Sequence, residues 1–131
     1  MEKTKVVFYA DDDVDDRGWV HDASSKLKHP LHFQFFSNGR EVLECLKDKC
    51  QSLPALIVLD LNMPELDGRQ TLQRLKDHPE YKEIPVAIVT TSANKIDIDV
   101  CKRLGASLFL IKPYTHVEWQ NIIRQLEPLV N

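Results

Sequence analysis

The stretch LIVLDLNMP, residues 56–64, decides the fold of this chain. Its first four residues, Leu56 to Leu59, are all apolar and lack the alternation of a strand with one solvated face. Near-continuous apolar runs of this length are typical of strands covered on both faces in a parallel sheet. The run then delivers a single carboxylate, Asp60, which either terminates the strand and does nothing more or belongs to a functional site.

Other short apolar runs repeat this pattern, at residues 6–10, 33–36, 86–89 and 108–111. Segments with the apolar spacing of helices follow the five runs in turn, within residues 19–27, 42–46, 72–75, 96–104 and 117–126. Strands alternating with helices predict an α/β fold, a doubly wound (βα)5 domain with a five-stranded parallel sheet. The pattern uses the whole chain, so we expect residues 1–131 to form one domain with no output domain. It leaves the strand order open, and the common flavodoxin-like order 2-1-3-4-5 is our working hypothesis.

Several polar residues predict where helices begin and end. Thr115 and Glu118 have the spacing of a capping box, and Asn38 with Glu41 forms a looser version. Gly105 follows the helical pattern of residues 96–104, where a left-handed C-terminal cap is expected.

Composition excludes several classes of protein. The chain has 131 residues, of which 43% are hydrophobic and 28% charged, with a net charge of −3. This is the balance of an ordinary globular domain, and the charge is too mild for a nucleic-acid or membrane surface. Neither a membrane-spanning run nor a signal-peptide pattern is evident, so we expect a cytoplasmic protein. The three cysteines, Cys45, Cys50 and Cys101, match no zinc spacing and are interpreted as packing residues, and the histidines form no metal motif.

Polar side chains collect where the predicted strands end. Asp11 and Asp12 follow the first strand, Asp60 the third, Thr90 the fourth and Lys112 the fifth. In open parallel sheets, ligands bind beyond the carboxyl ends of the strands, at the crevice where the strand order reverses. With the order 2-1-3-4-5, the first and third strands flank that crevice. We therefore expect the three aspartates to share one pocket, with the threonine and the lysine around it.

Such a pocket calls for a cation. Three neighbouring carboxylates repel one another, and Lys112 supplies only one positive charge. Mg²⁺ would resolve the repulsion, because it takes a few carboxylate or carbonyl oxygens and leaves positions open for water or a phosphoryl oxygen. A carboxylate beside such an ion, an ammonium group and a hydroxyl can attack phosphorus and hold the product as an aspartyl phosphate.

A purely structural explanation competes for some of these acids. Asp residues after a strand often cap the next helix or interact with its dipole, and we prefer that explanation for Asp13, Asp15 and Asp16. For Asp60 taken alone the two explanations are evenly matched. Its combination with the other acids, the hydroxyl and the lysine on one sheet edge favours a functional role.

Four segments, VVFYADDD (6–13), LIVLDLNMPELDG (56–68), PVAIVTTSAN (85–94) and GASLFLIKPY (105–114), together resemble the receiver domain of two-component response regulators. The resemblance covers almost the whole chain and implies the same flavodoxin-like fold. It implies that Asp60 accepts the phosphoryl group and that Asp11 and Asp12 bind Mg²⁺ together with Asp60 and the backbone carbonyl of Asn62. Asp13 falls at a variable position of the family and is left out of the metal site.

The resemblance also assigns the remaining positions. Lys112 pairs with the phosphoryl group, and its bond to Pro113 is where the family places a cis peptide. Thr90 is the switch hydroxyl, and Phe109 occupies the aromatic switch position, although it lacks the hydroxyl of the frequent tyrosine. Asn62 and Ser92 line the approach of water and tune the phosphoryl lifetime. Asp67 is interpreted as a helix N-cap, and Trp19 and Trp119 as packing residues.

The function implied is that of a stand-alone response regulator. It takes a phosphoryl group from a phosphohistidine on a sensor histidine kinase or a histidine phosphotransfer domain, with Mg²⁺ as cofactor. It catalyses only its own phosphotransfer and dephosphorylation, and it either switches a surface for an unidentified protein target or relays the group. We expect a monomer or weak dimer that binds neither nucleic acid nor membranes.

Three alternatives stay open. The first is a pseudoreceiver that binds a partner without phosphorylation, although such proteins usually lack an acid or the lysine. The second is a phosphohydrolase with an aspartate nucleophile, which would need a second Asp where Asn62 stands. The third is a flavodoxin, which the acidic, glycine-free loop after the first strand makes a poor fit for a flavin phosphate.

Overall fold

The structure is a computed structural model that describes residues 5–48, 52–91 and 94–130. It contains one parallel sheet in the order β2-β1-β3-β4-β5, which confirms the predicted fold class and strand order. The strands are β1 (Val6–Ala10), β2 (His32–Phe36), β3 (Leu56–Leu59), β4 (Val86–Thr90) and β5 (Leu108–Ile111).

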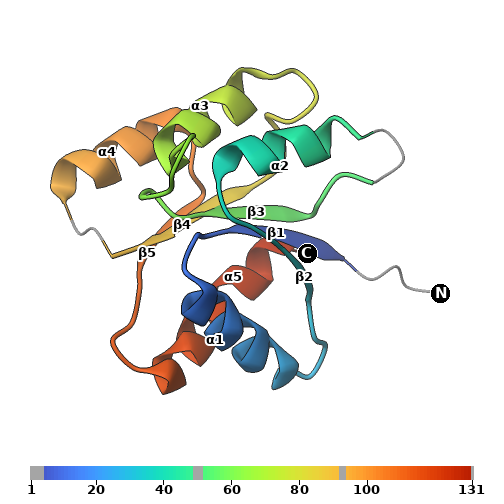
Figure 1. Ribbon diagram of the computed structural model, residues 1–131, viewed down its shortest axis with the longest axis vertical. Helices are drawn as coiled ribbons and strands as arrows, with labels where there is room; N and C mark the ends of the chain where they lie inside the picture. Colours follow the sequence, from blue (N-terminus) through green and yellow to red (C-terminus); the bar gives the residue numbers. More distant parts are fainter. Residues whose placement is uncertain (1–4, 49–51, 92–93, 131) are drawn as a thin grey trace.

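Helices cover both faces of the sheet, as Figure 1 shows. α1 and α5 pack together on one face, and α2, α3 and α4 lie side by side on the other. The helices are α1 (Val14–Ser25), α2 (Gly39–Leu46), α3 (Gly68–Asp77), α4 (Lys95–Leu104) and α5 (Trp119–Val130).

Strand β3 lies in the middle of the sheet and is buried on both faces. Leu56 and Val58 pack into the core beneath α1 and α5, while Ile57 and Leu59 pack into the core beneath α2, α3 and α4. All four side chains are inaccessible to solvent. The apolar run that predicted a doubly covered strand is therefore confirmed here.

The edge strands differ from that prediction. Most residues of β2 and β5 are only half-buried, and His32 and Ile111 are exposed. An edge strand has a neighbour on one side only, so a helix layer covers it less completely. A continuous apolar run alone did not distinguish these strands from the central ones.

Helix ends follow the sequence signals with two corrections. Asp67 caps α3 in a full capping box with Gln70, and Gly105 ends α4 in the left-handed conformation at φ +104°, as predicted. Thr115 does not form the predicted box: its hydroxyl donates to the Glu118 carboxylate at 2.9 Å, and residues 116–118 form a 3₁₀ turn before α5.

The looser capping pair at α2 is formed in part. The Asn38 side chain accepts the N–H of Glu41 at 3.0 Å, as a cap should. The Glu41 carboxylate, however, accepts the N–H of Ser37 instead of reaching back to residue 38. The reciprocal bond of a complete box is thereby moved one residue towards β2.

The two tryptophans occupy different environments. Trp119 is buried between α5 and the sheet, as expected of a packing residue. Trp19 is 38% exposed, because Val20 and Ala23 take the inward face of α1, and its ring stacks on that of His116. Among the cysteines, Cys101 is buried in the core, Cys45 is half-buried, and Cys50 lies outside the described residues. No helix in the described part of the chain is long and apolar enough to span a bilayer.

Candidate functional site

Three aspartates meet at the carboxyl edge of the sheet. One carboxylate oxygen each from Asp11, Asp12 and Asp60 lies within 4.8 Å of the other two. The parallel register sets this meeting, because Ala10 and Leu59 are partners in adjacent strands and the next residues follow side by side. The N–H of Asp60 donates to the Ala10 carbonyl at 3.1 Å, which continues the ladder to the site itself. Asp11 and Asp60 are buried, whereas Asp12 is exposed.

The loop after β3 fixes the orientation of Asp60. The N–H of Asn62 donates to Asp60 Oδ1 at 3.1 Å, and the N–H of Gly68 donates to the Leu61 carbonyl at 3.1 Å. The start of α3 approaches so closely that a Cβ on Gly68 would lie 2.3 Å from the Asp60 carbonyl oxygen. Only glycine fits there, so the DG pair at 67–68 serves both as the cap of α3 and as the seat of the Asp60 loop.

Lys112 supplies the positive charge of the site. Its Nζ atom lies 2.7 Å from Asp60 Oδ2, 2.8 Å from Asp11 Oδ2 and 2.7 Å from Asp16 Oδ2, and its side chain is 8% exposed. Burial alone would lower the pKa of Lys112, but hydrogen bonds to the three carboxylates outweigh it and raise the pKa above the ordinary lysine value. The ammonium therefore stays charged across the physiological range.

One ammonium does not offset the carboxylates around it. Burial raises the pKa of Asp11 from 3.8 to about 6, although Lys112 and the N–H of Asp13 act in the opposite direction, and the charge of Asp60 raises it further. A second cation next to this carboxylate would favour its ionised form and lower its pKa. The cluster of Asp11, Asp12 and Asp60 offers oxygen ligands only, which suits a hard divalent cation.

Thr90 is the last residue of β4, at the carboxyl edge of the sheet, and Phe109 lies on β5 as the register partner of Ile88. Thr90 is fully buried, and its hydroxyl has no hydrogen-bond partner among the described residues. The N–H of Lys112 donates to the Thr90 carbonyl at 2.8 Å, so the two strand ends are joined at the site. Phe109 is half-buried and packs against the core beneath α2, α3 and α4.

One expectation at this edge is wrong, and another concerns a residue outside the described ranges. The predicted cis peptide before Pro113 is wrong: no peptide bond is cis within the described ranges. The trans form is the intrinsically favoured one for a bond to proline. Ser92, expected to line the approach of water together with Asn62, lies outside the described residues.

Sequence reasoning missed Asp16 as a member of the site. Its sequence position favours a role with the helix dipole, and Asp13 does cap α1 by accepting the N–H groups of Asp15 and Asp16. The Asp16 side chain nevertheless turns to Lys112. The available signal was its place on the first turn of α1, a helix that starts directly from the acidic loop after β1.

Tyr9 is a second residue that the sequence did not single out. It is buried, packs edge-on against Phe33 and tilted against Phe35, and its hydroxyl has no partner in the described part of the chain. Burial, followed by the charges of the site aspartates, raises its pKa well above the ordinary tyrosine value. The phenol therefore stays neutral beneath the acidic cluster.

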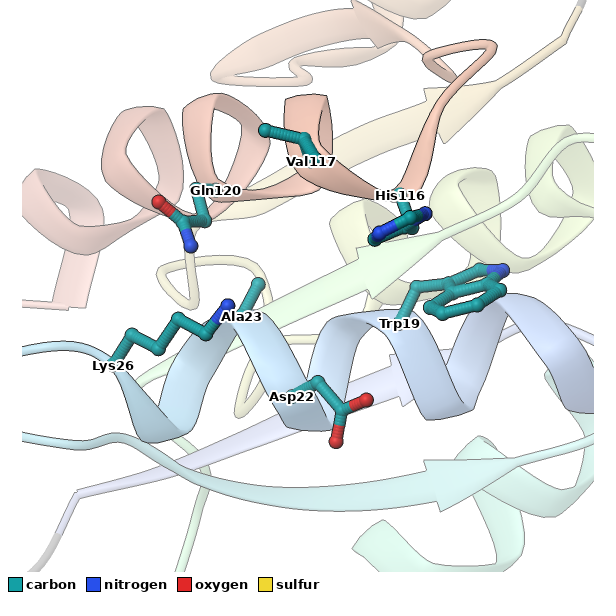
Figure 2. Close-up of a pocket in the computed structure, with 7 residues that line it drawn as sticks. All are labelled: Trp19, Asp22, Ala23, Lys26, His116, Val117 and Gln120. Atoms are coloured by element: carbon teal, nitrogen blue, oxygen red, sulfur yellow. The ribbon is translucent and has the colours of Figure 1, made fainter.

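A separate shallow pocket of about 120 Å³ lies between α1 and the start of α5 (Figure 2). The stacked rings of Trp19 and His116 form one end of it, and Lys26 and Gln120 lie near the other. None of the site residues lines this pocket. The pocket is therefore separate from the carboxylate cluster.

Fold and site together define a flavodoxin-like α/β protein with an acidic, lysine-containing site at the strand switch point. A profile of the family described as "Response regulator receiver domain" matches residues 7–124. The chain belongs to this family, whose members are the phosphorylated signalling modules of two-component systems.

Known regulatory proteins align with this chain over different lengths. Response regulator Rcp1 of Synechocystis sp. is 44% identical over 59 residues, which cover 45% of this chain and 40% of Rcp1. The probable methanogenesis regulatory protein FilR2 of Methanothrix harundinacea is 25% identical over 108 residues, 80% of this chain and 70% of FilR2. The aligned part thus spans less than half of Rcp1.

Solved structures agree over nearly the whole chain. The phosphorylated cyanobacterial phytochrome response regulator RcpA superposes with a TM-score of 0.88 at 29% identity, covering 95% of this chain and 92% of RcpA. The Mn(2+)-bound form of Rcp1 superposes with a TM-score of 0.86 at 27% identity, covering 94% and 91%. The first of these proteins is phosphorylated and the second holds a divalent metal ion.

Proposed function

We propose that this receiver accepts a phosphoryl group from a phosphohistidine onto Asp60. One observation carries the proposal: the Asp60 carboxylate is buried at the sheet edge with Oδ2 on Lys112 and Oδ1 on the N–H of Asn62. Both contacts fix the orientation of the Asp60 carboxylate within the acidic cluster. A residue that merely ended a strand would not need a buried ammonium as its partner.

The transfer is an in-line displacement at phosphorus. A carboxylate oxygen of Asp60 forms the new P–O bond while the P–N bond of the phosphohistidine breaks, and the electron pair of that bond stays on the imidazole nitrogen. The Lys112 ammonium, already at the site, offsets charge on the transferring group. In a later, separate step water attacks the phosphorus of the aspartyl phosphate and the P–O bond to Asp60 breaks, which releases inorganic phosphate and restores the Asp60 carboxylate.

Mg²⁺ is the proposed cofactor, held by Asp11, Asp12, Asp60 and the backbone carbonyl of Asn62. The residues fit, because three carboxylate oxygens converge within 4.8 Å and Asp11 is costly to ionise without more positive charge. When bound, the cation neutralises charge on the phosphoryl oxygens. The protein supplies the rest, by fixing Asp60 through Asn62 and by burying Asp11 beneath the site.

Thr90 and Phe109 are proposed to change position when Asp60 is phosphorylated. The Thr90 hydroxyl is buried without a described partner, so a phosphoryl oxygen on Asp60 would give it one. Movement of Thr90 towards the group would free space next to β5 for Phe109. The surface formed by α4, β5 and α5 would then change its affinity for a protein target that stays unidentified.

The proposed partners follow from this chemistry. A sensor histidine kinase or a histidine phosphotransfer domain would donate the phosphoryl group in the cytoplasm, and neither nucleic acid nor a membrane surface is proposed as a partner. The domain would act as a monomer or weak dimer. It is proposed as a signalling module and not as an enzyme acting on other substrates, since its only turnover is of its own phosphoryl group.

The test is incubation with a small acyl phosphate, with Mg²⁺ or with EDTA, followed by intact-mass analysis. We expect one added phosphoryl group in the presence of Mg²⁺ only, and none in an Asp60→Asn variant. An Asp67→Asn variant is the matched control, because Asp67 is half-buried, lies in the same loop and caps α3, where its carboxylate accepts the N–H of Gln70. Equal modification of wild type and Asp60→Asn would contradict Asp60 as the acceptor. No modification of wild type would leave a phosphorylation-independent interaction module as the better account.

A further inference from the structure

Asp16 shares Lys112 with two of the three candidate metal ligands. The Lys112 Nζ atom is 2.7 Å from Asp16 Oδ2, as close as it is to Asp60. Asp11 and Asp60 belong to the carboxylate cluster that could hold a cation, whereas Asp16 does not. We propose that Asp16 is a positioning residue that holds Lys112 when a divalent cation takes over Asp11 and Asp60. This inference deepens the proposed function and rests on it.

The argument begins with a competition. Without a metal ion, Lys112 is the positive partner of all three carboxylates. A divalent cation bound to Asp11 and Asp60 would compete with Lys112 for the negative charge of these two carboxylates and would repel the ammonium at short range. If Lys112 had only these two partners, cation binding would cost it every ionic contact. Asp16 leaves one contact in place, so the metal-bound site can keep its lysine.

The pair is buried enough for this contact to count. The side chains of Lys112 and Asp16 are 8% and 18% exposed, so water screens their interaction much less than it screens a surface pair. The backbone of Asp16 is fixed as well, since its N–H donates to the capping carboxylate of Asp13 at 3.2 Å. α1 itself is packed against α5. Asp16 is therefore an anchor of fixed position, which a flexible surface acid would not be.

Asp15 provides a matched comparison. It is the neighbouring residue of the same type in the same first turn, its N–H donates to the same cap, and its side chain is exposed. A role confined to net charge or to the helix dipole would make the two residues nearly equivalent. A role through Lys112 would make them different, because only Asp16 contacts the ammonium.

The experiment is a Mg²⁺ titration of the unphosphorylated protein by calorimetry, which needs no phosphoryl donor. We expect Asp16→Asn to weaken Mg²⁺ binding by about threefold to tenfold, within the coupling range of contacting charged residues. Asp15→Asn should change the affinity by less than about twofold, as distant surface charges do. Asp16→Glu, which keeps the charge, should recover most of the wild-type affinity.

A double-mutant cycle shows whether the effect passes through the lysine. Lys112→Met removes the competing ammonium and should tighten Mg²⁺ binding. In that background, adding Asp16→Asn should have no more effect than adding Asp15→Asn. A full Asp16→Asn effect without Lys112, or equal effects of the Asp15 and Asp16 variants with it, would overturn the inference. Absence of Mg²⁺ binding by wild type would instead contradict the metal site of the proposed function itself.

Discussion

Lys112 and Asp60 form a 2.7 Å ion pair although strand β4 separates the strands that carry them. Lys112 follows β5 and Asp60 follows β3, so the pair closes the carboxyl edge of the sheet across an intervening strand. The same ammonium also binds Asp11, which follows β1. Charge at Asp60 is thereby coupled directly to the end of β5, next to the surface proposed to change on phosphorylation.

Lys112→Met should destabilise the metal-free protein and make it dependent on Mg²⁺. The substitution keeps the apolar stem but leaves buried carboxylates without their ammonium partner, which costs about 3 kcal/mol or more for a buried pair. Thermal unfolding in EDTA and in Mg²⁺ measures the effect. The Mg²⁺-induced rise in Tm should be larger in the variant than in wild type, because the competing cation is gone.

Lys28→Met is the control for this prediction, since Lys28 is exposed. It should leave both the stability and its response to Mg²⁺ close to wild type. If Lys112→Met matched Lys28→Met in EDTA, the three ion pairs at Lys112 would not be present in solution.

Stability of the metal-free protein should fall as pH rises through about 6. The pKa of Asp11 is raised from 3.8 to about 6 by burial, so over this interval the native state binds more protons than the unfolded state. Stability is then fully present below the unfolded pKa and is lost as pH passes the native pKa, by roughly 1–3 kcal/mol. Denaturant unfolding of wild type and Asp11→Asn in EDTA isolates this contribution as their difference.

As pH rises from 3.8 to about 6, wild type should therefore lose stability relative to Asp11→Asn. Mg²⁺ should remove this relative loss by stabilising the ionised carboxylate. A difference between the two proteins that stays constant with pH would show that Asp11 titrates normally.

Two glycines should respond to alanine with opposite signs. At Gly68 a Cβ would lie 2.3 Å from the Asp60 carbonyl oxygen, so Gly68→Ala must displace backbone and should cost about 1–3 kcal/mol. At Gly18, in α1, nothing lies within 4 Å of the added carbon, and Gly18→Ala should stabilise by about 0.5–1 kcal/mol through helix propensity. Chemical denaturation gives both values.

Gly68→Ala should also slow modification of Asp60, because the displaced loop carries the N–H of Asn62. An unchanged rate of modification in that variant would show that the position of this loop does not affect phosphorylation of Asp60.

Thr90→Val should keep or raise the stability of the unmodified protein. The Thr90 hydroxyl is buried without a described partner, so replacing it with a methyl group removes a desolvated polar atom and gains up to about 1 kcal/mol. Phosphorylation at Asp60 should persist, while the accompanying NMR shifts in β5 and α4 should shrink. A loss of more than about 1 kcal/mol would indicate that the hydroxyl is hydrogen-bonded in the unmodified state.

Sequence pattern was sufficient for the parallel sheet, whereas the pairing of its first and third strands depended on the hypothesis of the common strand order 2-1-3-4-5, which the structure confirms. The run at residues 56–59 predicted a doubly covered strand, and adjacency to β1 then brought Asp11 and Asp60 together. Chain order also placed Thr90 and Lys112 at the same edge. These residues directly follow the predicted strands, so the prediction of the strand ends was enough to place them at one edge of the sheet.

Side-chain direction was beyond the same patterns. Asp16 had an adequate local explanation as a helix-dipole residue. Its contact with Lys112, which reaches from the end of β5 past β4 and β3, could not be predicted from the sequence patterns. Trp19 was expected to pack, yet Val20 and Ala23 occupy the inward face of α1. Thr115 and Glu118 had the right spacing for a capping box, but a 3₁₀ turn pairs their side chains with each other instead.

The most direct test of the central claim is to locate the modified carboxylate. Protein treated with acyl phosphate and Mg²⁺ is reduced with borohydride, which converts an aspartyl phosphate into homoserine, and the peptides are then sequenced by mass spectrometry. The account predicts homoserine at position 60 only, and none when EDTA replaces Mg²⁺. Homoserine at position 11 or 12, or at no position, would contradict it.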